Sequence, residues 1–145
     1  MRRLKKVGRR SGFTLMEVLL VIAIIALLVA FVVPQYLNVA QGAKIQNTQN
    51  TIMAMAKVIQ MYYLNVGAYP KELKDLVEKP EDEAVAAKWQ GPYLDSLDQL
   101  KDSWQQDLKY KCPGEFNPNS YDLWSVGPDG QDGNDDDISN WKKEK

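Results

Sequence analysis

The sequence predicts an α+β protein in which a long N-terminal α-helix packs on a small antiparallel β-sheet head. Three observations predict this class: a strongly apolar run near the N-terminus, a helical pattern that continues beyond it, and short β-like segments separated by turn residues closer to the C-terminus. We divide the 145 residues into a basic leader (1–12), a helix (13–66) and a globular head (67–145).

The apolar run extends from Phe13 to Val33 and contains a single charged residue, Glu17. A helix of these 21 residues is ~31 Å long, which is enough to cross the hydrocarbon core of a bilayer. We therefore predict that 13–33 is a transmembrane helix. A carboxylate inside such a segment costs roughly 2.5–3.5 kcal/mol, so it is expected to have a partner and a function. No other side chain in 13–33 can pair with it.

The residues at the start of this run form an informative junction. They read Arg9-Arg10-Ser11-Gly12-Phe13-Thr14-Leu15-Met16-Glu17. This junction resembles the cleavage site of type IV pilins and of the pseudopilins of type II secretion. The resemblance implies that a prepilin peptidase cuts after Gly12, methylates the new N-terminal amine of Phe13, and leaves Glu17 for filament assembly. We expect Glu17 to pair with the Phe13 amine of a neighbouring subunit, because a buried charge that lacks its partner is strongly destabilising.

Two simpler interpretations of the N-terminus are a secretory signal peptide and a signal anchor. A signal peptide fits the basic leader, but the apolar run is too long for one, and Val33-Pro34-Gln35 is a poor cleavage site. A signal anchor would leave Glu17 unexplained. We therefore favour the processed, pilin-like N-terminus.

The helical pattern continues past the membrane segment to residue 66. One stripe recurs at heptad-like spacing: Ile45, Thr48, Ile52, Met55, Ile59, Tyr62 and Val66. We predict that its later part packs against the chain's own head and that its earlier part faces neighbouring subunits. Pro34 predicts a kink, Gly42 predicts a flexible point, and Gly67 followed by Pro70 ends the helix. In pilin families the stretch between such positions can loosen on assembly, which by resemblance gives Pro34 a role there.

The head contains shorter elements bounded by glycine and proline. We predict two short helices, at 71–78 and 81–89, and two strands, at 108–112 and 121–126, with a turn at 114–119 between the strands. The strands should form a small antiparallel sheet on the back half of the long helix. Residues 142–145 read as a frayed, charged tail.

Charge and composition limit the function. Removal of the leader takes away six basic residues and moves the formal charge from −1 to −7, so we expect no nucleic-acid partner. The positive-inside rule places the leader in the cytoplasm and the head on the far side of the membrane. The chain lacks histidine and shows no nucleophile–base arrangement, so we do not expect an enzyme. Cys112 is the only cysteine, and we predict that it is a buried small hydrophobe.

Five aspartates occupy nine positions of a glycine-containing loop, 126–138. A hard divalent cation such as Ca²⁺ would turn their mutual repulsion into coordination by carboxylate and backbone oxygens. The loop lacks the spacing of an EF-hand, because Gln131 and Gly133 occupy two ligand positions and the closing glutamate is absent. From composition alone, a solvated acidic turn is at least as good an interpretation.

The C-terminal sequence resembles that of major pseudopilins of type II secretion. The matching residues are Tyr121-Asp122-Leu123-Trp124-Ser125-Val126-Gly127-Pro128-Asp129-Gly130, Asp136-Asp137-Ile138 and Asn140-Trp141. The resemblance implies one Ca²⁺ bound by the side chains of Asp129, Asp136 and Asp137. It also implies backbone ligands from Val126 and Gln131, with Pro128 as a further candidate, and leaves Asp132 and Asp135 solvated. One departure is Asp102-Ser103-Trp104-Gln105, where the family usually has Asp-Pro-Trp-Gly, which puts the local turn in doubt.

The resemblance implies the major structural subunit of a type II secretion pseudopilus. Such a subunit sits in the inner membrane with its head in the periplasm and polymerises with itself into a periplasmic filament. The filament promotes export of folded proteins through an outer-membrane secretin. The implied partners are minor pseudopilins, the prepilin peptidase/N-methyltransferase and an inner-membrane assembly platform. The alternatives are a minor pseudopilin, a type IV pilin and, in another class, a membrane-anchored Ca²⁺-binding periplasmic module.

Overall fold

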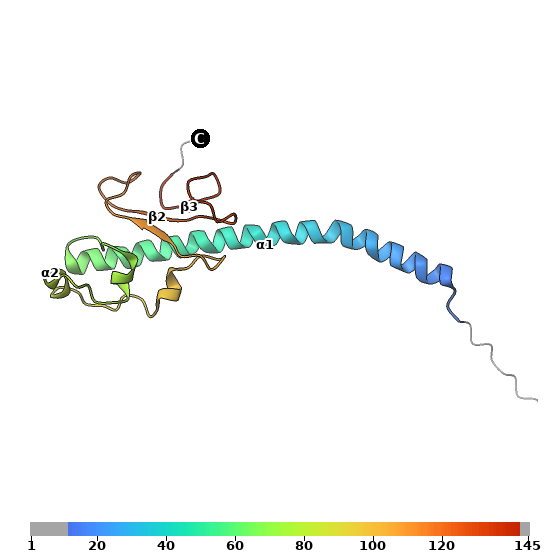
Figure 1. Cartoon of the computed structure of the whole chain (residues 1–145), viewed down its shortest axis with the longest axis horizontal. Helices are drawn as coiled ribbons and strands as arrows, with labels where there is room; N and C mark the ends of the chain where they lie inside the picture. The colour runs from blue at the N-terminus through green and yellow to red at the C-terminus, as the bar shows by residue number, and fades with distance from the viewer. Residues whose placement is uncertain (1–11, 143–145) are drawn as a thin grey trace, which may run out of the picture. The chain divides into compact units, whose positions relative to one another are not determined.

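A computed structural model describes residues 12–142 of the chain (Figure 1). Its elements, in chain order, are α1 (Leu15–Val66), η1 (Leu73–Leu76), α2 (Glu83–Ala86), η2 (Leu97–Leu100), β1 (Lys109–Lys111), β2 (Asp122–Ser125) and β3 (Ile138–Ser139). The chain separates between Val39 and Ala40 into two compact units, and α1 contributes to both.

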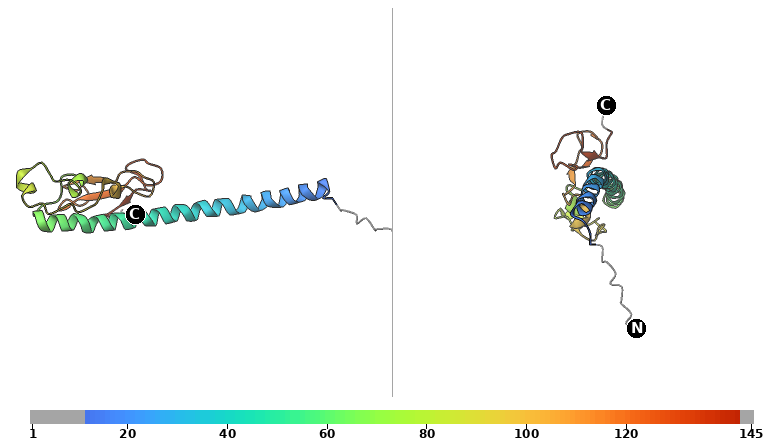
Figure 2. Two further views of the ribbon diagram at one scale, coloured as in Figure 1. Left: turned by 90° about the horizontal axis from the view of Figure 1, so that it is seen from below. Right: turned by 90° about the vertical axis from the view of Figure 1, so that its right-hand side faces the viewer.

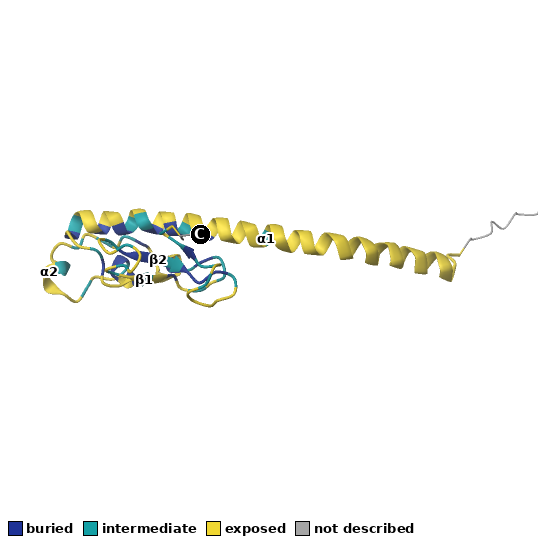
Figure 3. Ribbon diagram, turned by 90° about the horizontal axis from the view of Figure 1, so that it is seen from above, coloured by how far each residue is buried: buried dark blue, intermediate teal, exposed yellow. Residues whose placement is uncertain are grey.

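The first unit is the N-terminal part of α1. The helix begins at Leu15, two residues later than predicted, because Thr14 acts as its N-cap: the backbone N–H of Glu17 donates to Thr14 Oγ1 at 3.2 Å. By length and composition this helix could cross a membrane, and its apolar side chains here are exposed (Figure 3). Pro34 and Gly42 both lie inside α1, which is continuous at both positions. The predicted kink and flexible point stay predictions.

In the second unit, the later part of α1 buries one face against the head. The buried residues of α1 are Thr48, Ile52, Met55, Ile59, Tyr62 and Val66, which are the predicted stripe without its first member. Ile45 is 40% exposed because the head reaches α1 only from Thr48 onward. The later part of the stripe therefore packs on the head as predicted, but this part comprises six of the seven members. Contact of the earlier part with neighbouring subunits stays a prediction.

The segment between α1 and the sheet is less helical than predicted. Residues 71–78 contain only the 3₁₀ turn η1, because the buried Asp75 carboxylate accepts the backbone N–H groups of Lys71 and Glu72 and fixes a tight cap. Residues 81–89 contain only the single-turn helix α2, which Asp82 caps through the N–H of Ala84 at 3.0 Å. The 3₁₀ turn η2 was not predicted.

The sheet has three antiparallel strands in the order β1-β2-β3. The two predicted strands are confirmed, each slightly shorter than expected, and β3 was not predicted. In the register, Tyr110 lies opposite Leu123 and Lys109 lies opposite Trp124. Successive residues of a strand point to opposite faces, so Leu123 and Tyr110 face the core while Trp124 and the two lysines of β1 lie on the outer face.

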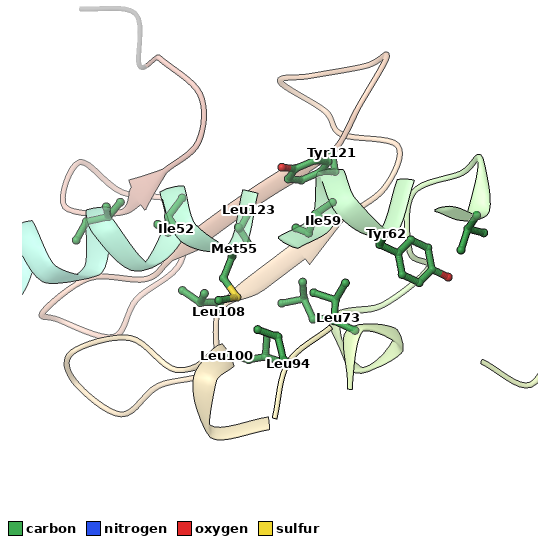
Figure 4. Close-up of a cluster of buried hydrophobic side chains, with 13 residues drawn as sticks. Ile52, Met55, Ile59, Tyr62, Leu73, Leu94, Leu100, Leu108, Tyr121 and Leu123 are labelled. Atoms are coloured by element: carbon green, nitrogen blue, oxygen red, sulfur yellow. The ribbon is translucent and has the colours of Figure 1, made fainter. Parts of the chain in front are cut away.

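The hydrophobic core lies between this inner sheet face and α1. Ile52, Met55 and Ile59 of α1 approach Leu108 and Leu123 in Figure 4. Each fully buried side chain of this size contributes roughly 1.5–3 kcal/mol. The core therefore holds the sheet, and with it the two ends of the acidic loop, against α1.

Candidate functional sites

The predicted processing site lies just outside α1. Gly12 and Phe13 precede the helix, and the Phe13 side chain is 79% exposed. Glu17 lies in the first turn of α1, where its charge interacts favourably with the helix dipole. The structure thus places the predicted cleavage bond in non-helical backbone next to the predicted assembly carboxylate. Residues 1–11 of the leader lie outside the described residues.

The acidic loop is closed at its base by strand pairing. β2 ends at Ser125 and β3 begins at Ile138, and these two residues are partners in the antiparallel register. The pairing brings Val126 near Asp137 across the loop ends. The sequence analysis missed β3 because Ile138 and Ser139 are too short a run to show the alternation of a strand.

The predicted carboxylate ligands lie on neighbouring parts of this loop. Asp136 Oδ2 accepts the backbone N–H of Asp129 at 3.4 Å, and Asp129 Oδ1 accepts the N–H of Gln131 at 2.9 Å. Asp137 Oδ2 accepts the N–H of Gly133 at 2.9 Å. The loop thus wraps its backbone around its own carboxylates. Among residues 12–142, no three acidic, cysteine or histidine side chains form a ready metal-binding group.

Two local observations test whether these residues suit a cation. Asp137 Oδ1 is a buried carboxylate oxygen without a hydrogen-bond partner, which is costly unless something positive binds it. Gly127 has φ +69°, and a Cβ there would lie 2.4 Å from the backbone oxygen of Asp136. Only glycine allows this close approach of the two loop segments. The oxygen donors are those that Ca²⁺ prefers, so the residues fit this ion.

The Asp132 carboxylate is not only solvated, as expected, but also makes a hydrogen bond within the protein. Its side chain is exposed, but Asp132 Oδ1 accepts the indole N–H of Trp124 at 2.7 Å. This hydrogen bond ties the tip of the acidic loop to the outer face of β2. Asp135 is likewise exposed and makes an interaction of its own.

A buried hydrogen-bond network supports the start of the loop. Asp102, which is 4% exposed, accepts the N–H groups of Trp104 at 2.8 Å and Gln106 at 2.9 Å through Oδ1. Its Oδ2 accepts the hydroxyl of Ser125 at 2.6 Å, and Ser125 Oγ accepts the N–H of Gly127 at 3.1 Å. Asp102 therefore positions both its own turn and the first residues of the acidic loop. The sequence analysis missed this role of Asp102, because a single aspartate in a polar segment matches no motif.

The same turn contacts α1. The Thr48 hydroxyl donates to Ser103 Oγ at 3.0 Å, and the Ser103 N–H donates to Thr48 Oγ1 at 3.2 Å. A proline at 103 would lack this N–H. The turn at Asp102-Ser103-Trp104-Gln105, which the sequence left in doubt, is therefore formed. Ser103 supplies its polar contact to α1.

Cys112 is half-buried rather than buried. It follows the last residue of β1 and packs against the core, and its thiol donates to the backbone oxygen of Ser120 at 3.7 Å. The prediction of a buried cysteine was therefore wrong in degree, because the strand ends before the residue is covered.

Comparisons with known proteins agree with the fold and the junction. Residues 35–141 match the family described as Type II secretion system (T2SS), protein G, and residues 8–33 match the prokaryotic N-terminal methylation motif. The chain is 38% identical over 140 residues to the type II secretion system core protein G of Pseudomonas aeruginosa, which covers 92% of this chain and 96% of that protein. It is 36% identical over 149 residues to the protein of the same name from Escherichia coli K12, covering 98% and 100%.

A solved structure extends the comparison to three dimensions. The crystal structure of the major pseudopilin from the type 2 secretion system of enterohaemorrhagic Escherichia coli aligns with a TM-score of 0.62 at 28% identity, covering 72% of this chain and 87% of that chain. The long helix, the small antiparallel sheet and the junction at Gly12 define a pilin-like protein. Within that class, the chain belongs to the type II secretion system protein G family, that of the major pseudopilin.

Proposed function

We propose that this chain polymerises with itself into the periplasmic pseudopilus of a type II secretion system, which promotes export of folded proteins through an outer-membrane secretin. The observation that carries the proposal is the match of residues 35–141 to the protein G family, together with the methylation motif at 8–33. The subunit's role is structural, and no catalytic step is assigned to it.

The N-terminal part of α1 supplies the surface for polymerisation. Its apolar side chains are exposed on all sides, so they can contact lipid before assembly and neighbouring helices after it. Shape alone would allow many axial offsets between such helices. Glu17 selects among them, because its carboxylate is stabilised only where a neighbour's Phe13 amine lies beside it.

This assembly requires a set of partners. A prepilin peptidase/N-methyltransferase cuts after Gly12 and methylates Phe13, and the exposed, non-helical backbone at this bond supports its accessibility. The basic leader orients the chain with its N-terminus in the cytoplasm and its head in the periplasm. An inner-membrane assembly platform then extracts the subunit into the filament, which minor pseudopilins join.

The acidic loop binds one Ca²⁺ in this proposal. Asp129, Asp136 and Asp137 supply carboxylate oxygens, and Val126 and Gln131 supply backbone oxygens, with Pro128 as a further candidate. The partnerless oxygen of Asp137 and the close approach at Gly127 support the assignment. The ion would neutralise the repulsion between the carboxylates and hold the segment between β2 and β3 in one conformation.

The experiment that tests the polymerisation proposal uses Glu17→Ala in a host with the complete secretion system. The variant should insert into the membrane at the wild-type level, because loss of a charge favours insertion. It should nevertheless form no pseudopili and secrete no substrate, because the register signal is lost. Membrane fractionation and filament counts by electron microscopy measure the two outcomes.

A matched control is Glu72→Ala, which removes one exposed carboxylate from the head and should leave filaments intact. Normal filaments and normal secretion with Glu17→Ala would contradict the pairing of Glu17 with a neighbour. That result would leave polymerisation in place and remove only the Glu17 register signal, whereas a wild-type chain that forms no filaments would favour the rival interpretation, a membrane-anchored Ca²⁺-binding module that does not polymerise.

A further inference from the structure

The outer face of the sheet carries a cleft that takes no part in the packing of α1, and one of its lining residues is Asp137, a ligand of the proposed Ca²⁺ site. Its volume is about 770 Å³, and it opens on the sheet face opposite to the one that packs on α1. Three segments build it: the outer face of β1 and β2, the turn that follows β1, and the acidic loop with the residues after β3. Because α1 lies on the other face, a ligand in this cleft would not compete with packing between helices.

Three aromatic rings meet in the cleft. Phe116 and Trp141 stack with their ring centres 4.4 Å apart and their planes 7° apart, and Trp124 meets Trp141 edge-on at 5.7 Å. None of the three belongs to the hydrophobic core, and Phe116 is 61% exposed. Trp124 and Trp141 are half-buried. Aromatic rings that are accessible and already stacked contribute strongly to binding at interfaces, so their gathering here indicates a recognition surface.

A carboxylate is fixed at the edge of these rings. Trp124 Nε1 donates to Asp132 Oδ1 at 2.7 Å, which orients the carboxylate of this exposed side chain. The nearby Lys111 is already compensated by Glu115, with 2.9 Å between Nζ and Oε2. The Asp132 charge is therefore held at the ring edge and is not cancelled by Lys111. The other lysine that lines the cleft, Lys142, has an exposed side chain.

We propose that this cleft binds an arginine side chain presented by a basic segment of a partner protein. A guanidinium group is flat, so it stacks on an aromatic face, and its N–H fork pairs with a carboxylate at the ring edge. Lysine offers a point charge without the flat face. The head, residues 67–145, contains ten lysines and eighteen acidic residues, and its formal charge of −8 attracts such a segment over longer distances.

The test uses the full chain in a detergent without a sugar headgroup, at saturating Ca²⁺, with ¹⁵N-labelled tryptophan. The chain has four indole N–H signals, which single Trp→Phe changes assign. The probe is the peptide acetyl-Gly-Arg-Gly-Arg-Gly-amide. We expect saturable shifts of the Trp124 and Trp141 signals and none of Trp89 and Trp104. The same peptide with citrulline in place of arginine keeps the shape and loses the charge, and should bind about tenfold more weakly.

Two charge variants separate the cleft from general electrostatic attraction. Asp132→Asn keeps an acceptor for Trp124 Nε1 and removes the charge, so affinity for the arginine peptide should fall about tenfold. Asp98→Asn removes one charge from an 84% exposed side chain on η2 and should leave affinity unchanged. Unmoved Trp89 and Trp104 signals in each variant establish that the head is still folded.

Three results would overturn the proposal. Equal affinity for the arginine and citrulline peptides would show that the positive charge of the guanidinium group does not contribute to binding. Unchanged affinity of the Asp132→Asn variant for the arginine peptide would show that the Asp132 carboxylate does not pair with arginine. Saturable shifts with a chito-oligosaccharide but none with the arginine peptide would show that the rings recognise a sugar instead.

Discussion

Gln105 is the one non-glycine residue with a positive φ, 65°, among residues 12–142. A side chain in this left-handed region is strained, whereas glycine adopts it freely. The turn is nevertheless formed because Asp102 accepts N–H groups on both sides of Gln105. The residue is therefore held in its conformation by the buried carboxylate and not by its own preference.

Gln105→Gly should stabilise the head. Relief of the left-handed strain outweighs the extra backbone entropy of glycine in the unfolded chain, for a net gain of roughly 0.5–1 kcal/mol. Thermal unfolding of the full-length protein in detergent, followed by near-ultraviolet circular dichroism of the tryptophans, measures the change. Gln105→Ala keeps the Cβ and should gain nothing. A lower melting temperature for the glycine variant would show that Gln105 is not strained.

At the scale of elements, the acidic loop joins β2 to β3 and is anchored at three points. Strand pairing closes its base, Asp102 and Ser125 hold its first residues, and Trp124 holds its tip through Asp132. The carboxylates of Asp129, Asp136 and Asp137 are thus confined to a small region. If the proposed Ca²⁺ site forms here, their repulsion in its absence would make the stability of the head depend on the ion.

Removal of Ca²⁺ should lower the melting temperature of the head by several degrees. An ion that binds only the folded state stabilises it by ~2.7 kcal/mol at a hundredfold excess over Kd, and ~1 kcal/mol corresponds to ~4–8 °C for a domain of this size. Melting in chelator and in excess Ca²⁺ measures the difference. Mg²⁺ should substitute poorly because it requires tighter octahedral geometry.

Variants locate this response within the loop. Asp129→Ala and Asp136→Ala should abolish the Ca²⁺ dependence, whereas Asp132→Asn, which keeps its acceptor for Trp124, should retain it. Equal melting of the wild-type protein with and without Ca²⁺ would mean that the loop is a solvated acidic turn.

The long helix and the strands β1 and β2 could be predicted from the sequence, whereas the 3₁₀ turns and β3 could not. The buried stripe of α1 followed from periodicity because a helix of this length repeats its pattern many times. The 3₁₀ turns span four residues and β3 spans two, so neither shows a repeated pattern, and the side-chain hydrogen bonds of Asp75 and Asp82 determine where η1 and α2 begin. The loop composition pointed to the candidate cation site, but Asp102 and Ser125 were missed, because only the fold brings residues 23 positions apart into contact.

At the scale of the whole molecule, the head depends on α1 for five of the thirteen buried residues of its core. Tyr62 of α1 is 1% exposed, and burial, with a further contribution from the negative charge of Asp75, raises its pKa to about 12. Burial also raises the pKa of Tyr110 in β1 and the pKa of Tyr121, which directly precedes β2. These phenols pack around the contact between helix and sheet, so their ionisation reports on it.

Alkaline pH should separate the head from α1. The unfolded chain releases its tyrosine protons near pH 10, before the folded chain does, so stability is unaffected below pH 10 and falls between about pH 10 and 12. Melting temperatures measured from pH 8 to pH 12 should show this decline, and Tyr62→Phe should make it shallower. A constant melting temperature across this range would show that these phenols are not buried.

The central claim is that the processed amine of Phe13 in one subunit pairs with the carboxylate of Glu17 in another. Treatment of assembled filaments with a lipid-soluble carbodiimide, which joins a carboxylate to an adjacent amine, tests it most directly. The account predicts a covalent dimer in which mass spectrometry finds the N-terminus of Phe13 linked to Glu17, and no such dimer in non-assembled, membrane-inserted subunits. Filaments that yield no Phe13–Glu17 linkage, or that contain chains still carrying residues 1–12, would contradict it.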